Sequence, residues 1–136
     1  MTVPTLLRRL SPLLVMALIH AFSSLPGTPH GGGPVAAIPS WLHNLAHVPA
    51  YALLAASWHV ALGAPRGRRG ALLIGLLTVG YGVLDEWHQS FVPGRQCSAG
   101  DVLRDALGAA VGIWAMRSFA ALKMARSTAR PAARDQ

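Results

Sequence analysis

The sequence is poor in charge and in cysteine. Of its 136 residues only 12% are charged, against about 25% in an average soluble domain, and 52% are hydrophobic. This composition argues against a disordered chain, a coiled coil and an ordinary soluble enzyme. The single cysteine, Cys97, allows no internal disulfide and no metal-binding cysteine pair. A mean hydropathy of +0.39 instead indicates a small polytopic membrane protein with an all-α fold.

Acidic residues are also scarce, with 5 Asp and Glu against 12 Lys and Arg and a net charge of +7. Such a balance can indicate nucleic-acid binding, but the basic residues gather between long apolar runs, which is the pattern of positive-inside topology. We therefore predict no nucleic-acid partner. With both termini in the cytoplasm, only Arg95 and Arg104 lie outside, and the other basic residues lie inside: 8, 9, 66, 68, 69, 117, 123, 126, 130 and 134.

Four apolar segments predict a four-transmembrane-helix bundle. The runs cover 10–25, 41–62 and 71–84, and a last helix begins near Asp101 and ends near 122. The first run also resembles a signal peptide, but we predict a retained helix. The third run is shorter than the about 20 residues that span a bilayer, so it either includes residues 85–89 or is re-entrant. We predict a cytoplasmic segment 1–9, a transmembrane domain 10–122, a basic and mobile cytoplasmic tail 123–136, and an external loop 26–40.

This topology brings most of the chemically active side chains to the external side. Every acidic residue except Asp135 belongs there, and ionisable groups at membrane depth by default mark a functional site. Helical spacing of three or four residues pairs His47 with Tyr51 and places Asp85 beside both His88 and Gln89. The candidate site residues are His47, Tyr51, Asp85, Glu86, His88, Gln89, Arg95, Asp101 and Asp105.

Several kinds of chemistry fit these residues. A carboxylate, a histidine and an arginine can do acid–base work or hold an anionic head group. Two carboxylates with His47 or His88 can bind a divalent metal, but no spacing is diagnostic, so we predict no metal site and leave the cofactor open. Alternatively, Asp85 forms an ion pair with Arg95 or Arg104 that only closes the bundle. The glycines of the last two helices predict close helix packing: Gly75, Gly80, Gly82, Gly108 and Gly112.

The segment 85–95, Asp-Glu-Trp-His-Gln-Ser-Phe-Val-Pro-Gly-Arg, resembles the VanZ-like family of bacterial membrane proteins. That family's pattern is similar to Asp-Glu-x-x-Gln-x-Phe-x-Pro-Gly-Arg, followed by an aspartate, here Asp101, that opens a glycine-rich helix. His47 and Tyr51 match its His-x-x-x-Tyr, and Ser23-Ser24 also looks similar. The chain departs from the family at His43-Asn44, where Asp-Lys is usual, and at Asp105, where Asn is frequent.

The resemblance implies a multi-pass cell-envelope protein of the bacterial inner membrane. The founding relative of the family is linked to resistance to teicoplanin. We predict that an external polar pocket binds an anionic or peptidoglycan-related ligand, such as a cell-wall precursor or lipid head group, and affects teicoplanin susceptibility. Arg95 would hold the anion. One alternative is a small hydrolase or transferase on a lipid-linked substrate, with Asp85 or Glu86 as base and His47 or His88 as acid. Another is a structural helper of a membrane complex.

Overall fold

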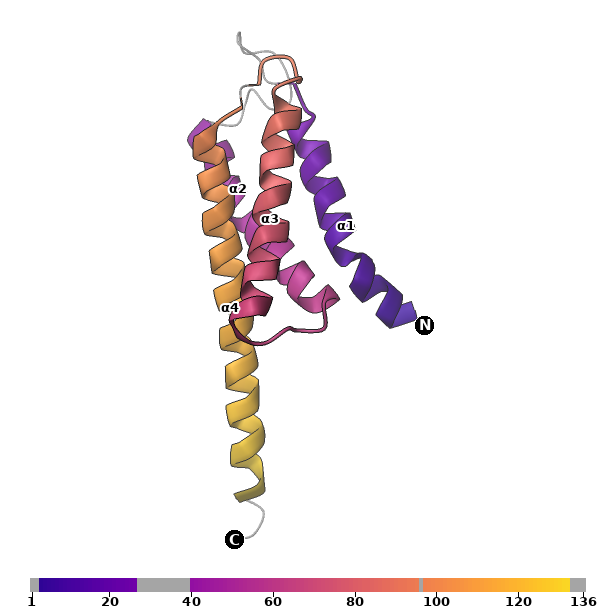
Figure 1. The fold of residues 1–136 in the computed structure, drawn as a ribbon, viewed down its shortest axis with the longest axis vertical. Coiled ribbons are helices and arrows are strands. Elements are labelled where there is room, and N and C mark those ends of the chain that lie inside the picture. The colour runs from indigo at the N-terminus through magenta and orange to yellow at the C-terminus, as the bar shows by residue number, and fades with distance from the viewer. Residues whose placement is uncertain (1–2, 27–39, 96, 133–136) are drawn as a thin grey trace.

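The protein is all-helical wherever its structure is described. The computed structural model describes residues 3–26, 40–95 and 97–132, which contain four helices and no strand: α1 Val3–Ser23, α2 Ser40–Ala61, α3 Gly67–Gln89 and α4 Ala99–Ala132 (Figure 1). The all-α prediction is confirmed. The predicted external loop 26–40 lies almost wholly outside the described residues, as does the side chain of His43.

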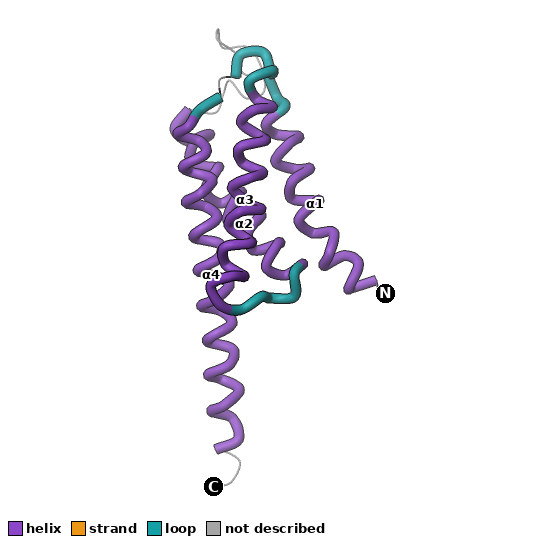
Figure 2. The backbone as a smooth tube through the Cα atoms, viewed as in Figure 1, coloured by secondary structure: helices purple, strands orange, loops and turns teal. Residues whose placement is uncertain are grey.

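Successive helices run in opposite directions along the bundle. The turn between α2 and α3 lies at the same end as both chain termini, and the connection from α3 to α4 lies at the opposite end (Figure 2). Gly63 makes the first of these turns with a φ of 77°, a conformation that glycine adopts without strain. The end of α3 and the start of α4 therefore share one end of the bundle, as the sequence predicted.

Two helices extend beyond their apolar runs. Helix α1 begins at Val3 and includes Arg8 and Arg9, and α4 continues to Ala132 without a break at residue 123. The tail predicted to be mobile is thus helical as far as Ala132, because it consists largely of Ala, Arg, Lys and Met, which are strong helix formers. Helix α3 includes residues 85–89 in one continuous helix of 23 residues, as the membrane-spanning alternative requires.

The distribution of apolar and polar side chains is inverted relative to a soluble protein. Large apolar side chains such as Leu76 and Trp114 are about 70% exposed, whereas charged residues including Asp85 and Glu86 are almost fully buried. Two segments, Pro4–Ser23 and Gly67–Gln89, are long and apolar enough to cross a membrane. Broad apolar surfaces of this kind in a monomer are stable in contact with lipid.

Helices α2 and α4 approach each other through glycine. A Cβ atom on Gly108 would lie 2.5 Å from the Val48 carbonyl oxygen, and one on Gly112 would lie 3.0 Å from the Ala52 Cα. Both positions therefore exclude any side chain, which confirms the predicted packing role of these two glycines. The same prediction is wrong for Gly80, where a Cβ would meet nothing within 4 Å.

Helix α1 is attached more loosely than the others. Only Pro12, Val15 and Ser23 of its described side chains are buried, and the helix leans away from its neighbours toward the N-terminus (Figure 1). The Tyr81 hydroxyl of α3 donates a hydrogen bond to the Met16 carbonyl at 2.7 Å. Helix α1 is therefore a partly detached wall beside the α2–α3–α4 unit.

Candidate functional site

The end of α3 supplies the most deeply buried acidic groups. Buried residues recur every three or four positions along α3, so Asp85, Glu86 and Gln89 all fall on the face toward the bundle. Asp85 is 3% and Glu86 2% exposed. The Gln89 side-chain amide donates to Asp85 Oδ2 at 3.0 Å and to Glu86 Oε1 at 3.3 Å. One amide thus holds both carboxylates in place.

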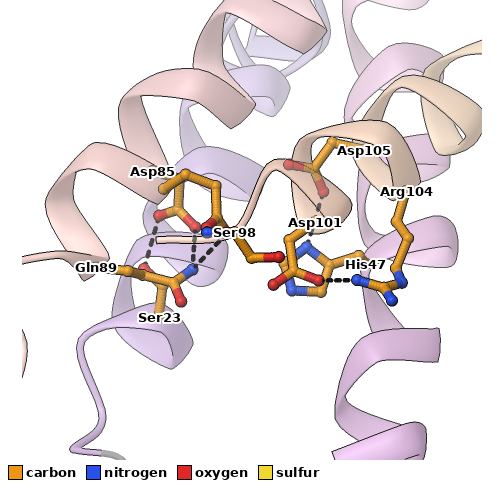
Figure 3. Close-up of polar contacts among 9 residues, drawn as sticks. Ser23, His47, Asp85, Gln89, Ser98, Asp101, Arg104 and Asp105 are labelled. Carbon is orange, nitrogen blue, oxygen red and sulfur yellow. Dashed lines mark hydrogen bonds and ion pairs between the residues drawn. The ribbon is translucent and has the colours of Figure 1, made fainter. Parts of the chain in front are cut away.

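Asp85 connects α3 to α1. The Ser23 hydroxyl donates to Asp85 Oδ1 at 2.7 Å (Figure 3). One turn further, His88 Nε2 lies 3.1 Å from the Ser24 hydroxyl, and its ring is 4.4 Å from that of His20. His88 therefore belongs to the contact between α1 and α3, where it meets His20.

Arg95 lies at the C-terminal end of α1. Its Nε donates to the Leu25 carbonyl at 3.2 Å, and its Nη2 donates to the Phe22 carbonyl at 3.4 Å. The Phe22 carbonyl also accepts from the Leu25 backbone N–H at 3.2 Å, and a cation at this end of α1 complements the helix dipole. Among the described residues Arg95 makes no ion pair with Asp85, so the predicted Asp85–Arg95 lock is not formed.

Glu86 reaches toward the start of α4. Its Oε2 accepts a hydrogen bond from the Ser98 backbone N–H at 2.8 Å. Ser98 immediately precedes α4, and its carbonyl accepts bonds from the Asp101 and Val102 amides. Glu86 thereby fixes where α4 begins relative to α3.

His47 and Asp105 form the buried polar contact between α2 and α4. His47 Nδ1 lies 2.8 Å from Asp105 Oδ1, and the Asp105 side chain is 0% exposed (Figure 3). Asp105 fits there because α3 has a glycine opposite it: a Cβ on Gly82 would lie 2.6 Å from Asp105 Oδ2. That oxygen and the buried Tyr51 hydroxyl have no hydrogen-bond partner within the described structure.

Asp101 completes the acidic group from the first turn of α4. Its Oδ1 forms an ion pair with Arg104 Nη1, three residues further along the helix. Together His47, Glu86 and Asp101 each offer one potential ligand atom, and these three atoms lie within 4.8 Å of one another. The three residues come from α2, α3 and α4, so only the folded bundle assembles them.

A pocket of about 620 Å³ opens between α1 and α2 next to this group. Most of its wall is apolar, with side chains such as Leu18, Phe22 and Leu53. Its polar lining comes from Ser23, His47, Tyr51, Asp85 and Gln89. The pocket is thus amphipathic, with a hydrocarbon-like wall beside a buried carboxylate.

The structure brings together seven of the nine predicted site residues, and Arg95 and His88 lie apart from them at the α1 contact. The seven are His47, Tyr51, Asp85, Glu86, Gln89, Asp101 and Asp105. Sequence reasoning did not assign Ser23 or Ser98 to the site. The family pattern already marked Ser23, but Ser98 acts through its backbone N–H, which no residue type signals.

An apolar exterior, a buried polar centre and two helices long and apolar enough to cross a membrane are typical of a helical membrane protein. Within that class, the VanZ/LLP1 family model matches residues 3–121, and the chain belongs to this family. The match covers every helix that contributes to the site. Neither the curated proteins nor the solved structures contain a match to the chain.

Proposed function

We propose that this VanZ-like cell-envelope protein binds a lipid-linked envelope molecule in the pocket between α1 and α2. The hydrocarbon chain of the ligand lies along the apolar wall, and its polar head group reaches Asp85. The observation that carries this proposal is the pocket itself, because one cavity combines an apolar wall with a buried carboxylate. Its volume of about 620 Å³ falls within the usual range for ligand sites.

The charge of the pocket indicates the chemistry of the head group. An ionised carboxylate only accepts hydrogen bonds, so Asp85 favours a group that donates them, such as a sugar hydroxyl, an amide or an amine. Peptidoglycan precursors carry such groups. Arg95 instead donates to the carbonyls that end α1, so we place the head group at Asp85 rather than at Arg95.

The charge distribution supports a membrane orientation for this binding. The acidic residues of α3 and α4 lie at one end of the bundle, and the basic turn at Arg66 and Arg68 lies at the other (Figure 1). We propose four spans in the inner membrane over residues 10–122, with 1–9 and 123–136 on the cytoplasmic side. The pocket then faces the external leaflet, where binding of a cell-wall precursor would alter susceptibility to teicoplanin.

Binding of a lipid-linked peptidoglycan precursor to the protein in nanodiscs tests the proposal. Ala50→Trp fills the pocket and should abolish binding, whereas Ala110→Trp places the same ring on the exposed face of α4 and should not. Asp85→Asn removes a charged acceptor and should weaken binding by about 10- to 100-fold. Equal affinity of all three variants and the parent would refute the proposal.

One observation favours catalysis as a second candidate function. His47 is held by Asp105 and lies close to Glu86, so an oriented imidazole and a buried carboxylate face a common space. Such a pair can transfer protons during hydrolysis or group transfer on a lipid-linked substrate. Turnover of a lipid phosphate that Glu86→Gln abolishes would establish it. Binding without turnover would leave the binding function, and the absence of both would leave a structural helper.

A further inference from the structure

We infer that His47, Glu86 and Asp101 form a binding site for one divalent transition-metal ion, of the kind that Zn²⁺ represents. This site shares His47 with the lining of the lipid-binding pocket of the proposed function, but it does not depend on lipid binding. One imidazole and two carboxylates from three helices converge at the polar end of the bundle.

The distances suit a single ion. Potential ligand atoms of the three residues lie within 4.8 Å of one another. Zinc binds imidazole nitrogen and carboxylate oxygen at about 2.0–2.2 Å, so two ligands of one ion lie up to about 4 Å apart. Small side-chain rotations therefore bring all three atoms into coordination, and no helix has to move.

Neighbouring groups already orient the imidazole as metal sites require. Asp105 Oδ1 lies 2.8 Å from His47 Nδ1, and an ionised carboxylate only accepts, so Nδ1 carries the proton. The lone pair of a neutral imidazole is then on Nε2, and Figure 3 shows the second ring nitrogen on the side of Asp101. A carboxylate behind a histidine is the usual outer partner of a metal ligand.

The two carboxylate ligands are held in the same way. Glu86 accepts from the Ser98 amide and from Gln89. Asp101 Oδ1 is paired with Arg104, so Oδ2 is the oxygen available to an ion.

Uncompensated negative charge is an independent indication of a cation. Four carboxylates, from Asp85, Glu86, Asp101 and Asp105, are gathered here, and the ion pairs among the described residues join only His47 to Asp105 and Arg104 to Asp101. In addition, the buried Tyr51 hydroxyl, which lines the pocket with His47, and Asp105 Oδ2 have no hydrogen-bond partner within the described ranges. Buried charges of one sign are stable when paired or when they coordinate a metal.

The donor set indicates which ions bind. Imidazole suits zinc and other first-row transition metals, whereas calcium and magnesium prefer oxygen ligands alone. Three protein ligands leave one tetrahedral position open, as in zinc sites that also bind water or a substrate group.

Titration of the full chain in nanodiscs with Zn²⁺ and with Co²⁺ tests the inference. The protein used carries Cys97→Ser, because Cys97 is exposed and its thiolate could bind either ion. One ion should bind per chain, and Co²⁺ should show the visible absorption of a tetrahedral N/O site. His47→Gln, Glu86→Gln and Asp101→Asn should each reduce affinity more than 100-fold, and Asp105→Asn by about 10- to 100-fold. The matched control is His59→Gln, since His59 is a second buried histidine of α2. It should retain the affinity of the parent.

Two results would overturn the inference: no saturable binding of Zn²⁺ or Co²⁺ at millimolar concentration, or equal affinity in the three ligand variants and the parent. Should the variants fail to fold, X-ray absorption of the zinc-loaded parent decides, because a spectrum without one imidazole ligand would exclude the site. Ala50→Trp blocks the lipid pocket and should bind Zn²⁺ like the parent, so failure of the two proposals can be told apart.

Discussion

Helices α1 and α4 are attached to the rest of the bundle in opposite ways. Helix α4 is pressed against the α2 backbone at Gly108 and Gly112, whereas α1 buries few of its own side chains and is held at Ser23 by a hydrogen bond to Asp85. The close contact fixes the position of the imidazole–carboxylate group between α2 and α4. The loose contact forms one wall of the pocket. The same small protein therefore combines a closely packed polar centre with a loosely packed apolar wall.

The largest effect should come from a side chain inserted between α2 and α4. Gly112→Val forces Cβ against the Ala52 backbone, which must shift, so we expect a loss of about 3 kcal/mol or more in the free energy of unfolding. Unfolding in mixed detergent micelles containing SDS measures it. A loss below about 1 kcal/mol would show that this interface is as loose as that of α1.

The second effect concerns the polar contact across the same interface. Asp105→Ala removes the buried partner of His47 and should cost about 3 kcal/mol, because His47 is left in place without its carboxylate. The same unfolding assay measures this loss. Asp101→Ala is the comparison, since the Asp101–Arg104 pair is partly exposed and its loss should cost under about 1 kcal/mol. Equal losses would mean that the Asp105–His47 pair is no more important than a surface pair.

The third effect should be confined to α1. Ser23→Ala removes the hydroxyl that binds Asp85, and a hydrogen bond to a charged group contributes about 1.5–3 kcal/mol. Hydrogen exchange should accelerate in the C-terminal turn of α1 and remain unchanged in α4. Faster exchange in α4 as well would contradict the division into a tight and a loose contact.

The smallest effect should have the opposite sign. A methyl group on Gly80 meets nothing within 4 Å, so Gly80→Ala should stabilise α3 by up to about 1 kcal/mol through helix propensity alone. The free energies of unfolding of Gly80→Ala and Gly112→Val, measured in parallel, compare a glycine with open space around it with one in contact with α2. A destabilised Gly80→Ala would show that α3 has a close neighbour at this position.

The contrast between glycines shows what the sequence determines and what it does not. Gly108 and Gly112 share a four-residue spacing that predicts a contact face, and the structure has that contact. Gly80 also lies inside a helix, but it faces away from the other helices, and this depends on how α3 is rotated. The grouping of polar residues in 85–89 could likewise be predicted, because it follows from their spacing within one helix.

The direction in which long side chains point could not be predicted from the sequence in this way. Arg95 belongs to a recognisable string, yet it lies against the end of α1, and its predicted partner Asp85 binds Ser23 instead. Loop geometry decides whether Arg95 binds an acidic side chain or a backbone carbonyl, and that geometry depends on tertiary packing. The continuation of α4 to Ala132 was missed because charge was given more weight than helix propensity.

The hydrogen bonds that hold α1 to α3 are placed unevenly along the helix. Its hydrogen bonds to α3 through Ser23 and the Met16 carbonyl lie in its second half, and that of Ser24 follows directly after the helix. A helix of 21 residues is about 30 Å long, so a tilt of about 10° at the fastened end displaces the opposite end by about 5 Å. A small change of tilt near Asp85 would therefore produce a much larger displacement at the N-terminal end of α1.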